Sequence, residues 1–150
     1  MTNYIIRPIK SNEIHLLEDF LYEAIFQTDE TNLLTKDIIH KPEARIYIED
    51  FGKKDDFCLV ADINGEVVGA VWTRILAGQI KGYGNIDEYT PEFAISLYKE
   101  YRNKGIGTVL MQNMLQLLKE QGYKRTSLAV QKDNYAVRMY QSVGFKIVKE

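Results

Sequence analysis

The stretch YRNKGIGT, residues 101–108, decides how this sequence folds. It places two cationic side chains, Arg102 and Lys104, beside two glycines one residue apart, Gly105 and Gly107, and a long apolar run follows. Apolar residues at helical spacing after the glycines predict a helix that begins at this turn. The start of a helix has backbone N–H groups without intrahelical partners and a partial positive charge, so it binds phosphate readily. The stretch therefore predicts a backbone site for a diphosphate, which the glycines allow to approach closely.

The same stretch excludes two common phosphate-binding motifs. A P-loop would need Gly-Lys-Ser/Thr at the end of its glycine loop, and here Thr108 and Val109 follow Gly107. A dinucleotide-binding fingerprint would need a third glycine where Leu110 stands. The alternative is a glycine-tightened turn with two solvated cations, which remains open for a glycine pair taken alone.

The rest of the chain predicts one domain, residues 1–150, of the α/β (α+β) class. Its clearest local signal is Asn64-Gly65, a pair suited to a two-residue hairpin turn, between strand-like runs within residues 56–76. Ser11 is the predicted N-cap of the first helix, and Gly52 stands just past the predicted end of the second, which begins at Pro42. Further strands are predicted over residues 3–9, 91–98, 125–131 and 145–150, and helices over 12–26, 42–51, 105–120 and 133–144. The predicted order is β-α-α-β-β-β-α-β-α-β.

Composition restricts the partners of the chain. The formal net charge of −2 provides no global positive field, so we expect no nucleic-acid partner and no membrane partner. The single cysteine, Cys58, cannot form an internal disulfide and is interpreted as a small buried hydrophobe. There is neither a signal-like N-terminus nor an apolar run of the roughly 18 residues that a membrane span needs. We expect a soluble, cytoplasmic protein, and a homodimer is compatible with this composition.

A second stretch, LAVQKDNYAVRMYQSVGF, places Asn134, Ala136, Tyr140, Gly144 and Phe145 after a predicted strand. Together with the RNKGIG stretch that precedes it, this series resembles the GNAT superfamily of N-acetyltransferases over nearly the whole chain. The resemblance implies a mixed central sheet, splayed between its fourth and fifth strands to admit acyl-CoA. It also implies acetyl-CoA as the co-substrate.

The resemblance further implies where the co-substrate would lie. Its pantetheine would pair with the backbone around Leu97 and Tyr98. Its diphosphate would lie on the glycine turn, whose members are Arg102, Asn103, Lys104, Gly105, Ile106, Gly107 and Thr108.

Two positions depart from the family pattern. Lys99 stands where the family often has a proline before the turn, which makes the turn less rigid but removes no donor that it needs. Asn134, the remaining cofactor-binding residue that the resemblance implies, stands six residues before Tyr140, whereas the commoner spacing is seven and falls on Asp133. The alternative for Asn134 is an N-cap shared with Asp133.

Transfer to an amine needs a proton acceptor, because an ammonium with a pKa of about 10.4 is less than roughly one part in a thousand neutral at pH 7. Glu92, at the start of the strand that leads to the turn, resembles in placement the glutamate that some family members use as a base. Asp87 and Glu88 are nearby competitors. The alternative for Glu92 is an exposed carboxylate at a strand edge. The resemblance places the N–H donors for the developing oxyanion at the backbone near Leu97.

The departing thiolate needs a proton, and Tyr140 is the donor that the resemblance implies. The alternative for Tyr140 is a buried aromatic that only packs. His15 and His40 have no ligand spacing with any partner, so we expect no metal.

The sequence thus predicts an acyl-CoA-dependent N-acyltransferase that transfers acetyl from acetyl-CoA to a primary amine by direct attack. The acceptor would be a small molecule or a peptide, and the acidic NIDEY stretch together with Glu92 favours a cationic group. One alternative is a non-catalytic domain that binds or senses acyl-CoA. Another is an interaction domain in which the glycine stretch is merely a turn.

Overall fold

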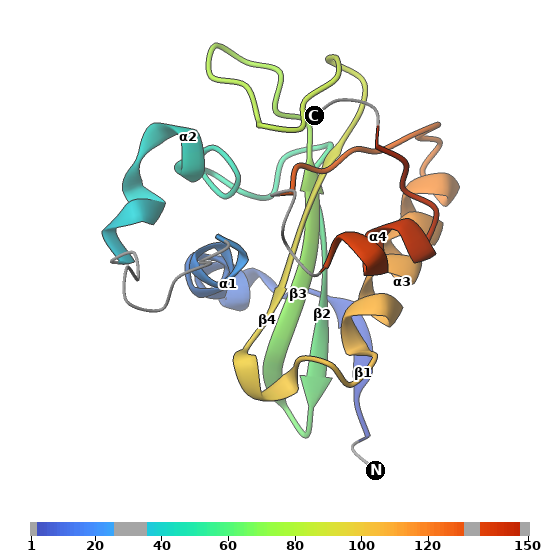
Figure 1. Cartoon of the computed structure of the whole chain (residues 1–150). Coiled ribbons are helices and arrows are strands. Elements are labelled where there is room, and N and C mark those ends of the chain that lie inside the picture. Colours follow the sequence, from blue (N-terminus) through green and yellow to red (C-terminus); the bar gives the residue numbers. More distant parts are fainter. Residues whose placement is uncertain (1–2, 26–35, 131–135, 148–150) are drawn as a thin grey trace.

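The computed structural model describes residues 3–25, 36–130 and 136–147, and its centre is a sheet of four strands (Figure 1). The strands lie in the order β1-β2-β3-β4, and each pair of neighbours is antiparallel. They are β1 (Ile5–Pro8), β2 (Phe57–Ile63), β3 (Glu66–Arg74) and β4 (Glu92–Leu97). Helices lie beside this sheet, so the predicted α/β class is confirmed.

The hairpin between β2 and β3 forms at the predicted pair. Asn64 and Gly65 have φ angles of 52° and 90°, the left-handed values that a type I′ turn needs at both central positions. The N–H of Gly65 donates to Oδ1 of Asp62 at 2.6 Å, and Oδ2 of Asp62 accepts from Nε of Arg7 on β1 at 2.9 Å. One carboxylate thus connects the turn to the neighbouring strand.

Side chains of the strands alternate between two apolar clusters, one on each face of the sheet. Val60 and Trp72 pack on one face with Phe20, while Val71 packs on the other face with Met114. Figure 1 shows the corresponding layers, with α1 on one side of the sheet and α3 and α4 on the other. The helices are α1 (Leu17–Ala24), α2 (Pro42–Arg45), α3 (Ile106–Glu120) and α4 (Val137–Ser142), and 3-10 helices cover Ser11–Leu16, Lys36–His40 and Lys99–Tyr101.

The first helix begins differently from the prediction. Ser11 is already part of the 3-10 turn, so it is not the N-cap. The residue in the N-cap position is Lys10, whose backbone N–H donates to Oε1 of Glu13 at 2.9 Å. The carboxylate of Glu13 therefore satisfies a donor at this end of the helix.

The second helix is shorter than predicted. α2 ends at Arg45, well before Gly52. Backbone carbonyls after Arg45 accept hydrogen bonds from side chains of β3 instead of from a continuing helix. Trp72 Nε1 donates to the carbonyl of Tyr47 at 3.0 Å, and Arg74 Nη1 donates to the carbonyl of Glu49 at 2.7 Å. The segment after α2 is therefore fastened to the sheet as a series of turns.

The predicted strand over residues 125–131 is reduced to one bridge in the part that the structure describes. Ser127 pairs with Glu92 in parallel, since Phe93 N donates to the carbonyl of Ser127 at 2.7 Å and Ser127 N donates to that of Pro91 at 3.0 Å. Beyond Ser127 the backbone packs against the loop at Gly84, where a Cβ atom would lie 2.8 Å from the carbonyl carbon of Leu128. This parallel bridge is the mixed element of the sheet among the described residues.

The strand predicted at residues 145–150 is also absent from the described part of that segment. Residues 145–147 are not in a strand, and residues 148–150 lie outside the described part. β4 is consequently the edge of the sheet: residues 94–97 pair with β3 on one side, and past the bridge no described strand pairs with them on the other. The divergence of β4 from the segment after Ser127 agrees with the predicted splay.

Candidate active site

The turn before α3 combines two left-handed residues with a glycine inside the helix. Gly105 is the N-cap of α3 with a φ of 86°, and Asn103 has a φ of 61°. Glycine adopts this conformation without the steric cost that other residues pay. Gly107 is already helical, and its lack of a side chain keeps the space between β4 and α4 open. A Cβ atom there would lie 3.4 Å from Leu97 Cδ1 and 3.7 Å from Met139 Cε.

The first turn of α3 presents backbone donors. The helix runs for 15 residues, and the N–H of Val109 donates to the carbonyl of Gly105 at 3.2 Å. The N–H groups of residues 106–108 precede this bond and have no carbonyl acceptor within the helix. Because the side chain of Ile106 is buried in the core, only its backbone can face a ligand. The turn thus has the donors and the open backbone that a diphosphate needs.

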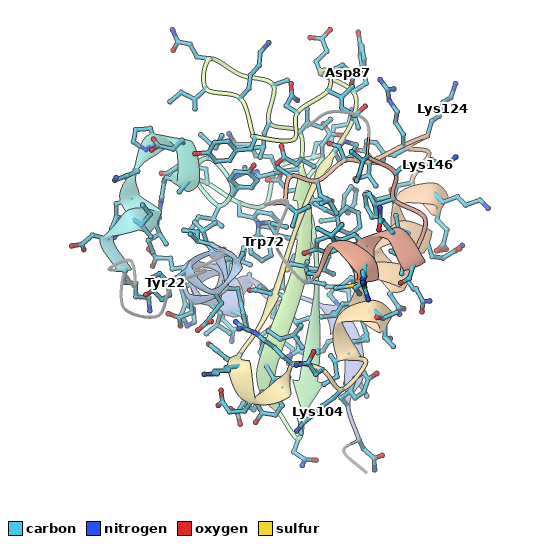
Figure 2. All side chains as sticks on the ribbon, viewed as in Figure 1. Tyr22, Trp72, Asp87, Lys104, Lys124 and Lys146 are labelled. Atoms are coloured by element: carbon cyan, nitrogen blue, oxygen red, sulfur yellow. The ribbon has the colours of Figure 1, made fainter. Side chains whose placement is uncertain are left out.

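The two cations of the turn lie in different environments. The sequence makes both candidates for binding the diphosphate, but Arg102 is turned inward: its Nε donates to the carbonyl of Leu97 at 3.0 Å, and its Nη2 pairs with Glu23 of α1 at 2.9 Å. Lys104 is exposed, with its ammonium 5.9 Å from the centroid of the Tyr101 ring. Figure 2 shows Lys104 beside the start of α3, at the opposite end of the molecule from Asp87. Lys104 is therefore the more available of the two charges for an anion.

The open edge of β4 offers backbone N–H groups near the turn. Phe93 donates outward to Ser127, so strand alternation directs the N–H groups of Ile95 and Leu97 to the same edge. The N–H of Tyr98, which was expected to face the pantetheine, points the other way: it donates to the carbonyl of Val68 on β3 at 3.0 Å. The backbone available for an extended ligand is therefore that of Ile95 and Leu97, while Tyr98 packs its ring on Phe20 at 4.9 Å between centroids.

Glu92 is buried, which overturns its interpretation as an exposed strand-edge carboxylate. Only 2% of the residue is exposed. Its Oε2 accepts hydrogen bonds from the hydroxyl of Tyr47 and from the N–H of Gly84, the latter at 3.1 Å, while Oε1 has no partner among the described residues. Burial raises the pKa of this carboxyl, and the hydrogen bonds from Tyr47 and Gly84 oppose that rise. A carboxylate whose pKa is raised in this way is a stronger proton acceptor than an exposed one.

The competing carboxylates are less suitable as a base. Asp87 accepts a hydrogen bond from the N–H of Tyr89 at 2.8 Å and pairs with Arg125. Hydrogen bonds, first from Thr90 and then from these partners, lower the pKa of Asp87 to about 2. Glu88 is exposed. Neither has the buried, partly unpartnered carboxylate of Glu92.

Tyr140 lies on α4, on the opposite face of the sheet from Glu92. Its half-buried ring is 6.4 Å from that of Phe145, which is 5.6 Å from that of Phe93, the neighbour of Glu92 on β4. The aromatic contacts of the packing interpretation are therefore present, and the role of the hydroxyl as an acid stays a prediction. Asn134 and its alternative as an N-cap lie outside the described residues.

Two residues of the site escape sequence analysis. Tyr47 hydrogen-bonds Glu92 from 45 positions away, and Glu23 pairs with Arg102 across 79 positions. Tyr47 falls within a segment predicted as plain helix, and Glu23 within the polar side of another. No local pattern marks either residue, because both are defined by contacts that only the fold creates.

Neither a metal cluster nor a membrane span is found in the described ranges. Residues 3–25, 36–130 and 136–147 contain no group of three His, Cys, Asp or Glu side chains placed to hold an ion. No helix within the same ranges has the length and apolarity to traverse a bilayer.

Comparison with known proteins agrees with this geometry. Residues 19–145 match the model of the acetyltransferase (GNAT) family, so the chain belongs to this family. An N-alpha-acetyltransferase of Sulfurisphaera tokodaii is 31% identical over 107 residues, which cover 69% of this chain and 64% of the relative. The chain therefore spans just under two thirds of that relative's length.

Two solved structures share the fold. A GCN5-related N-acetyltransferase from Ralstonia eutropha superposes with a TM-score of 0.74 at 16% identity, covering 99% of this chain and 95% of that one. A GNAT-family acetyltransferase from Brucella melitensis, solved in complex with acetyl-CoA, gives a TM-score of 0.66 at 18% identity and covers 98% and 85% of the two chains. The resemblance inferred from the RNKGIG and NYAVRMYQSVGF stretches is thus confirmed at the level of family and fold.

Proposed function

We propose that this domain is an acetyl-CoA-dependent N-acetyltransferase that acts on a primary amine. The observation that carries the proposal is the junction of two features: the donor-rich start of α3 and the open edge of β4 meet at the hydrogen bond from Arg102 to the carbonyl of Leu97. An extended ligand with a diphosphate at one end needs both features next to each other. Membership of the GNAT family implies acyl-CoA as the acyl donor, and the open edge of β4 would bind its extended part.

The residues present fit acyl-CoA. Its diphosphate would accept hydrogen bonds from the turn around Gly105 and the N–H groups of residues 106–108, with Lys104 adding charge. Its pantetheine would follow the N–H groups of Ile95 and Leu97. Since strand residues rise about 3.3 Å each, this path runs along β4 toward Glu92, about 17 Å from Leu97.

The two candidate proton-transfer groups lie on opposite faces of β4. Acetyl-CoA supplies the acetyl thioester. Glu92 accepts the proton of the acceptor ammonium, directly or through a water, so that the neutral amine attacks the carbonyl carbon. Outward N–H groups of β4 stabilise the negative charge that develops on the carbonyl oxygen. Tyr140 donates its proton to the sulfur as the carbon–sulfur bond breaks, the nitrogen loses its second proton to water as the amide forms, and water returns a proton to Tyr140.

The acceptor that we place first is the α-amino group of a peptide. The proposal rests on the name of the Sulfurisphaera tokodaii relative, an N-alpha-acetyltransferase. A small polyamine is the second candidate, because the loop that carries Asp87 and Glu88 is acidic.

A panel of amines tests this function. Peptides with free and blocked α-amines, a peptide with a free lysine only, and spermidine would be incubated with acetyl-CoA, and the release of free CoA would be measured. We expect CoA release with at least one amine and a loss of about 100-fold or more in Glu92→Gln, a typical general-base contribution. No turnover with any amine would contradict the enzyme and leave the acyl-CoA-sensing alternative.

Binding alone is measured separately. Because the turn exists only in the folded chain, CoA at a hundredfold excess over its dissociation constant stabilises the fold by about 2.7 kcal/mol. For a domain of this size that raises the midpoint of thermal unfolding by roughly 5–10 °C. Desulfo-CoA should act similarly, since the diphosphate contacts do not involve sulfur. No shift at millimolar CoA would contradict cofactor binding itself.

A further inference from the structure

Tyr47 connects three segments at the buried carboxylate of Glu92. It lies in the turns after α2, and its backbone is fixed by the 3.0 Å hydrogen bond from Trp72 Nε1 to its carbonyl oxygen. Its hydroxyl reaches Oε2 of Glu92 on β4 and also accepts from the N–H of Tyr83 at 3.0 Å. The residue is only 8% exposed, so its hydroxyl depends on these partners rather than on water.

The direction of each hydrogen bond in this network is fixed by chemistry. A backbone N–H can only donate, so the hydroxyl oxygen of Tyr47 is the acceptor for Tyr83. The hydroxyl hydrogen is then directed to Oε2 of Glu92, which also accepts from the N–H of Gly84 at 3.1 Å. Both donors to the carboxylate, the Tyr47 hydroxyl and the N–H of Gly84, therefore reach the same oxygen, and consecutive hydrogen bonds of this kind strengthen one another in a buried setting.

The other carboxylate oxygen is left without a partner. Oε1 of Glu92 is buried and accepts no hydrogen bond from the described residues. It is packed so closely against the backbone of Gly82 that a Cβ atom there would lie 2.1 Å away. The loop at residues 82–84 thus holds both sides of the carboxylate: one N–H donates to Oε2, and a bare glycine makes room for Oε1.

We propose that Tyr47 is a positioning residue that saturates Oε2 of Glu92 and thereby makes Oε1 the atom that accepts the proton of the amine. This inference rests on the proposed function, in which Glu92 is the base. Because Oε1 is buried, the proton reaches it through a water: the lone pair of Oε1 forms an O–H bond with a proton of that water as the water takes a proton from the ammonium, whose N–H bond breaks. Tyr47 itself keeps its proton throughout.

Electrostatics support this assignment. Burial, followed by the nearby Glu92, raises the pKa of the Tyr47 hydroxyl, so it stays a donor. A donor to a carboxylate favours the charged form, so the hydroxyl keeps the pKa of Glu92 from rising as far as burial alone would take it. Arg74, opposite Glu92 in the register of β3 and β4, is the nearest cation on the strands, but its guanidinium pairs with Asp56 at 3.0 Å.

Tyr47→Phe tests the inference, because it keeps the ring and deletes only the hydroxyl. The carboxyl pKa of Glu92 would be measured by NMR in protein with 13C-labelled glutamate carboxyls, assigned with Glu92→Gln. The pH profile of kcat/KM would be measured with an amine that the panel identifies. We expect the pKa of Glu92 and the acid limb of the profile to rise together by about one pH unit, a tenfold change in the ionised fraction at a given pH.

Tyr123→Phe is the matched control. Its hydroxyl also donates to a carboxylate, that of Asp55, and this hydrogen bond involves neither Glu92 nor Tyr47. We expect neither the pKa of Glu92 nor the rate profile to change in this variant. A double-mutant cycle adds a second check: in a Glu92→Gln background, Tyr47→Phe should have no further effect on the rate.

The outcomes separate this inference from the proposed function. The NMR titration needs no turnover, so an unchanged Glu92 pKa in Tyr47→Phe overturns the inference even if no amine is a substrate. A shifted pKa with an unshifted rate profile in an active enzyme also overturns it, because Tyr47 would then act on Glu92 without acting on the reaction. If Tyr47→Phe does not fold, Tyr47→3-fluorotyrosine, a stronger acid and donor, should lower the pKa of Glu92, and an unchanged pKa overturns the inference.

Discussion

Arg102 donates its Nε–H to the carbonyl oxygen of Leu97 at 3.0 Å while its Nη2 pairs with Glu23. One guanidinium therefore joins the end of β4, the turn before α3 and the helix α1. Its planar fork can hold a carbonyl and a carboxylate at once, which the single ammonium of a lysine cannot do in the same geometry.

Arg102→Lys should loosen the turn without removing the charge. We expect a loss of about 1.5–3 kcal/mol in the free energy of unfolding, the range of a hydrogen bond from a charged donor, and weaker CoA binding. Urea unfolding and CoA titration measure the two effects. Glu23→Gln is the control for the ion pair alone, which is about one third exposed, so its loss should cost under about 1 kcal/mol. Equal losses in both variants would contradict a special role for the bond to Leu97.

Gly107→Ala should separate folding from CoA binding. Its Cβ would make ordinary contacts with Leu97 and Met139 at 3.4 and 3.7 Å. Since alanine favours a helix over glycine by about 1 kcal/mol, stability should be unchanged or slightly higher. The same methyl group lies between β4 and α4, so CoA affinity should fall. Normal CoA affinity would show that the space at Gly107 is not needed for CoA binding.

Gly105→Ala should lose stability as well as affinity, because its φ of 86° is unfavourable for a residue with a side chain. Gly122→Ala is a matched control: its φ is 91°, its Cβ would also meet nothing within 4 Å, and it lies at the far end of α3. We expect a similar cost of about 1–2 kcal/mol in both variants but reduced CoA affinity only in Gly105→Ala. Calorimetry with CoA compares the two.

Tyr140→Phe should reduce turnover far more than CoA affinity. The ring contact with Phe145 is kept, and only the hydroxyl is lost. The expected decrease is about 100-fold, the low end of general-acid effects, because a thiol of pKa about 8.5 leaves readily and a phenol of pKa about 10 gives up its proton less easily. An unchanged maximal rate would support the packing interpretation instead.

Glu13 should make stability depend on pH at the acid end. Its carboxylate accepts two hydrogen bonds from Arg7, at 2.9 and 2.8 Å, which lower its pKa from 4.5 to about 2. A lowered pKa means that the contribution is complete above pH 4.5 and is lost as the pH falls toward 2. With allowance for partial solvent exposure we expect a loss of about 1–2 kcal/mol in the free energy of unfolding over this window.

Urea unfolding between these pH values, compared with Glu13→Gln, measures the effect. The variant should be less stable at neutral pH and less dependent on pH below it. Glu49→Gln, in the more exposed pair with Arg45, should leave the pH profile close to that of the wild type. A Glu13→Gln profile identical to the wild type would contradict the assignment.

Sequence alone predicts the local features of this fold well. Asn64 and Gly65 determine a hairpin because the backbone angles of a two-residue turn depend on the residues within it. The apolar spacing after Gly107 predicts α3 to within a residue of its observed bounds. The glycine turn was predictable for the same reason, since its conformation is local.

The sequence could not predict which groups meet across the fold. Tyr47 and Glu92 are brought together by a loop and two strands, and Arg102 finds Glu23 only once α1 lies over β4. The burial of Glu92 also arises only when these segments pack together, which is why its interpretation as an exposed carboxylate was wrong. The strand predicted at residues 125–131 had suitable composition, but in the described part it makes one bridge to β4, and beyond it the backbone packs closely against Gly84.

The antiparallel order of the sheet has a consequence for how the protein folds. The β2–β3 hairpin closes over two residues and can form within microseconds, whereas β1 pairs with a strand more than 50 positions away and β4 must first close the loop of residues 75–91. We therefore expect the sheet to grow outward from its middle, with β4 and its contacts among the last to form. In native-state hydrogen exchange, the amides of β3 should open only with global unfolding, while those at the outer edge of β4 exchange earlier. The part of the molecule that would bind acyl-CoA is then the part that opens locally at the lowest free energy, and a bound ligand would slow its opening most.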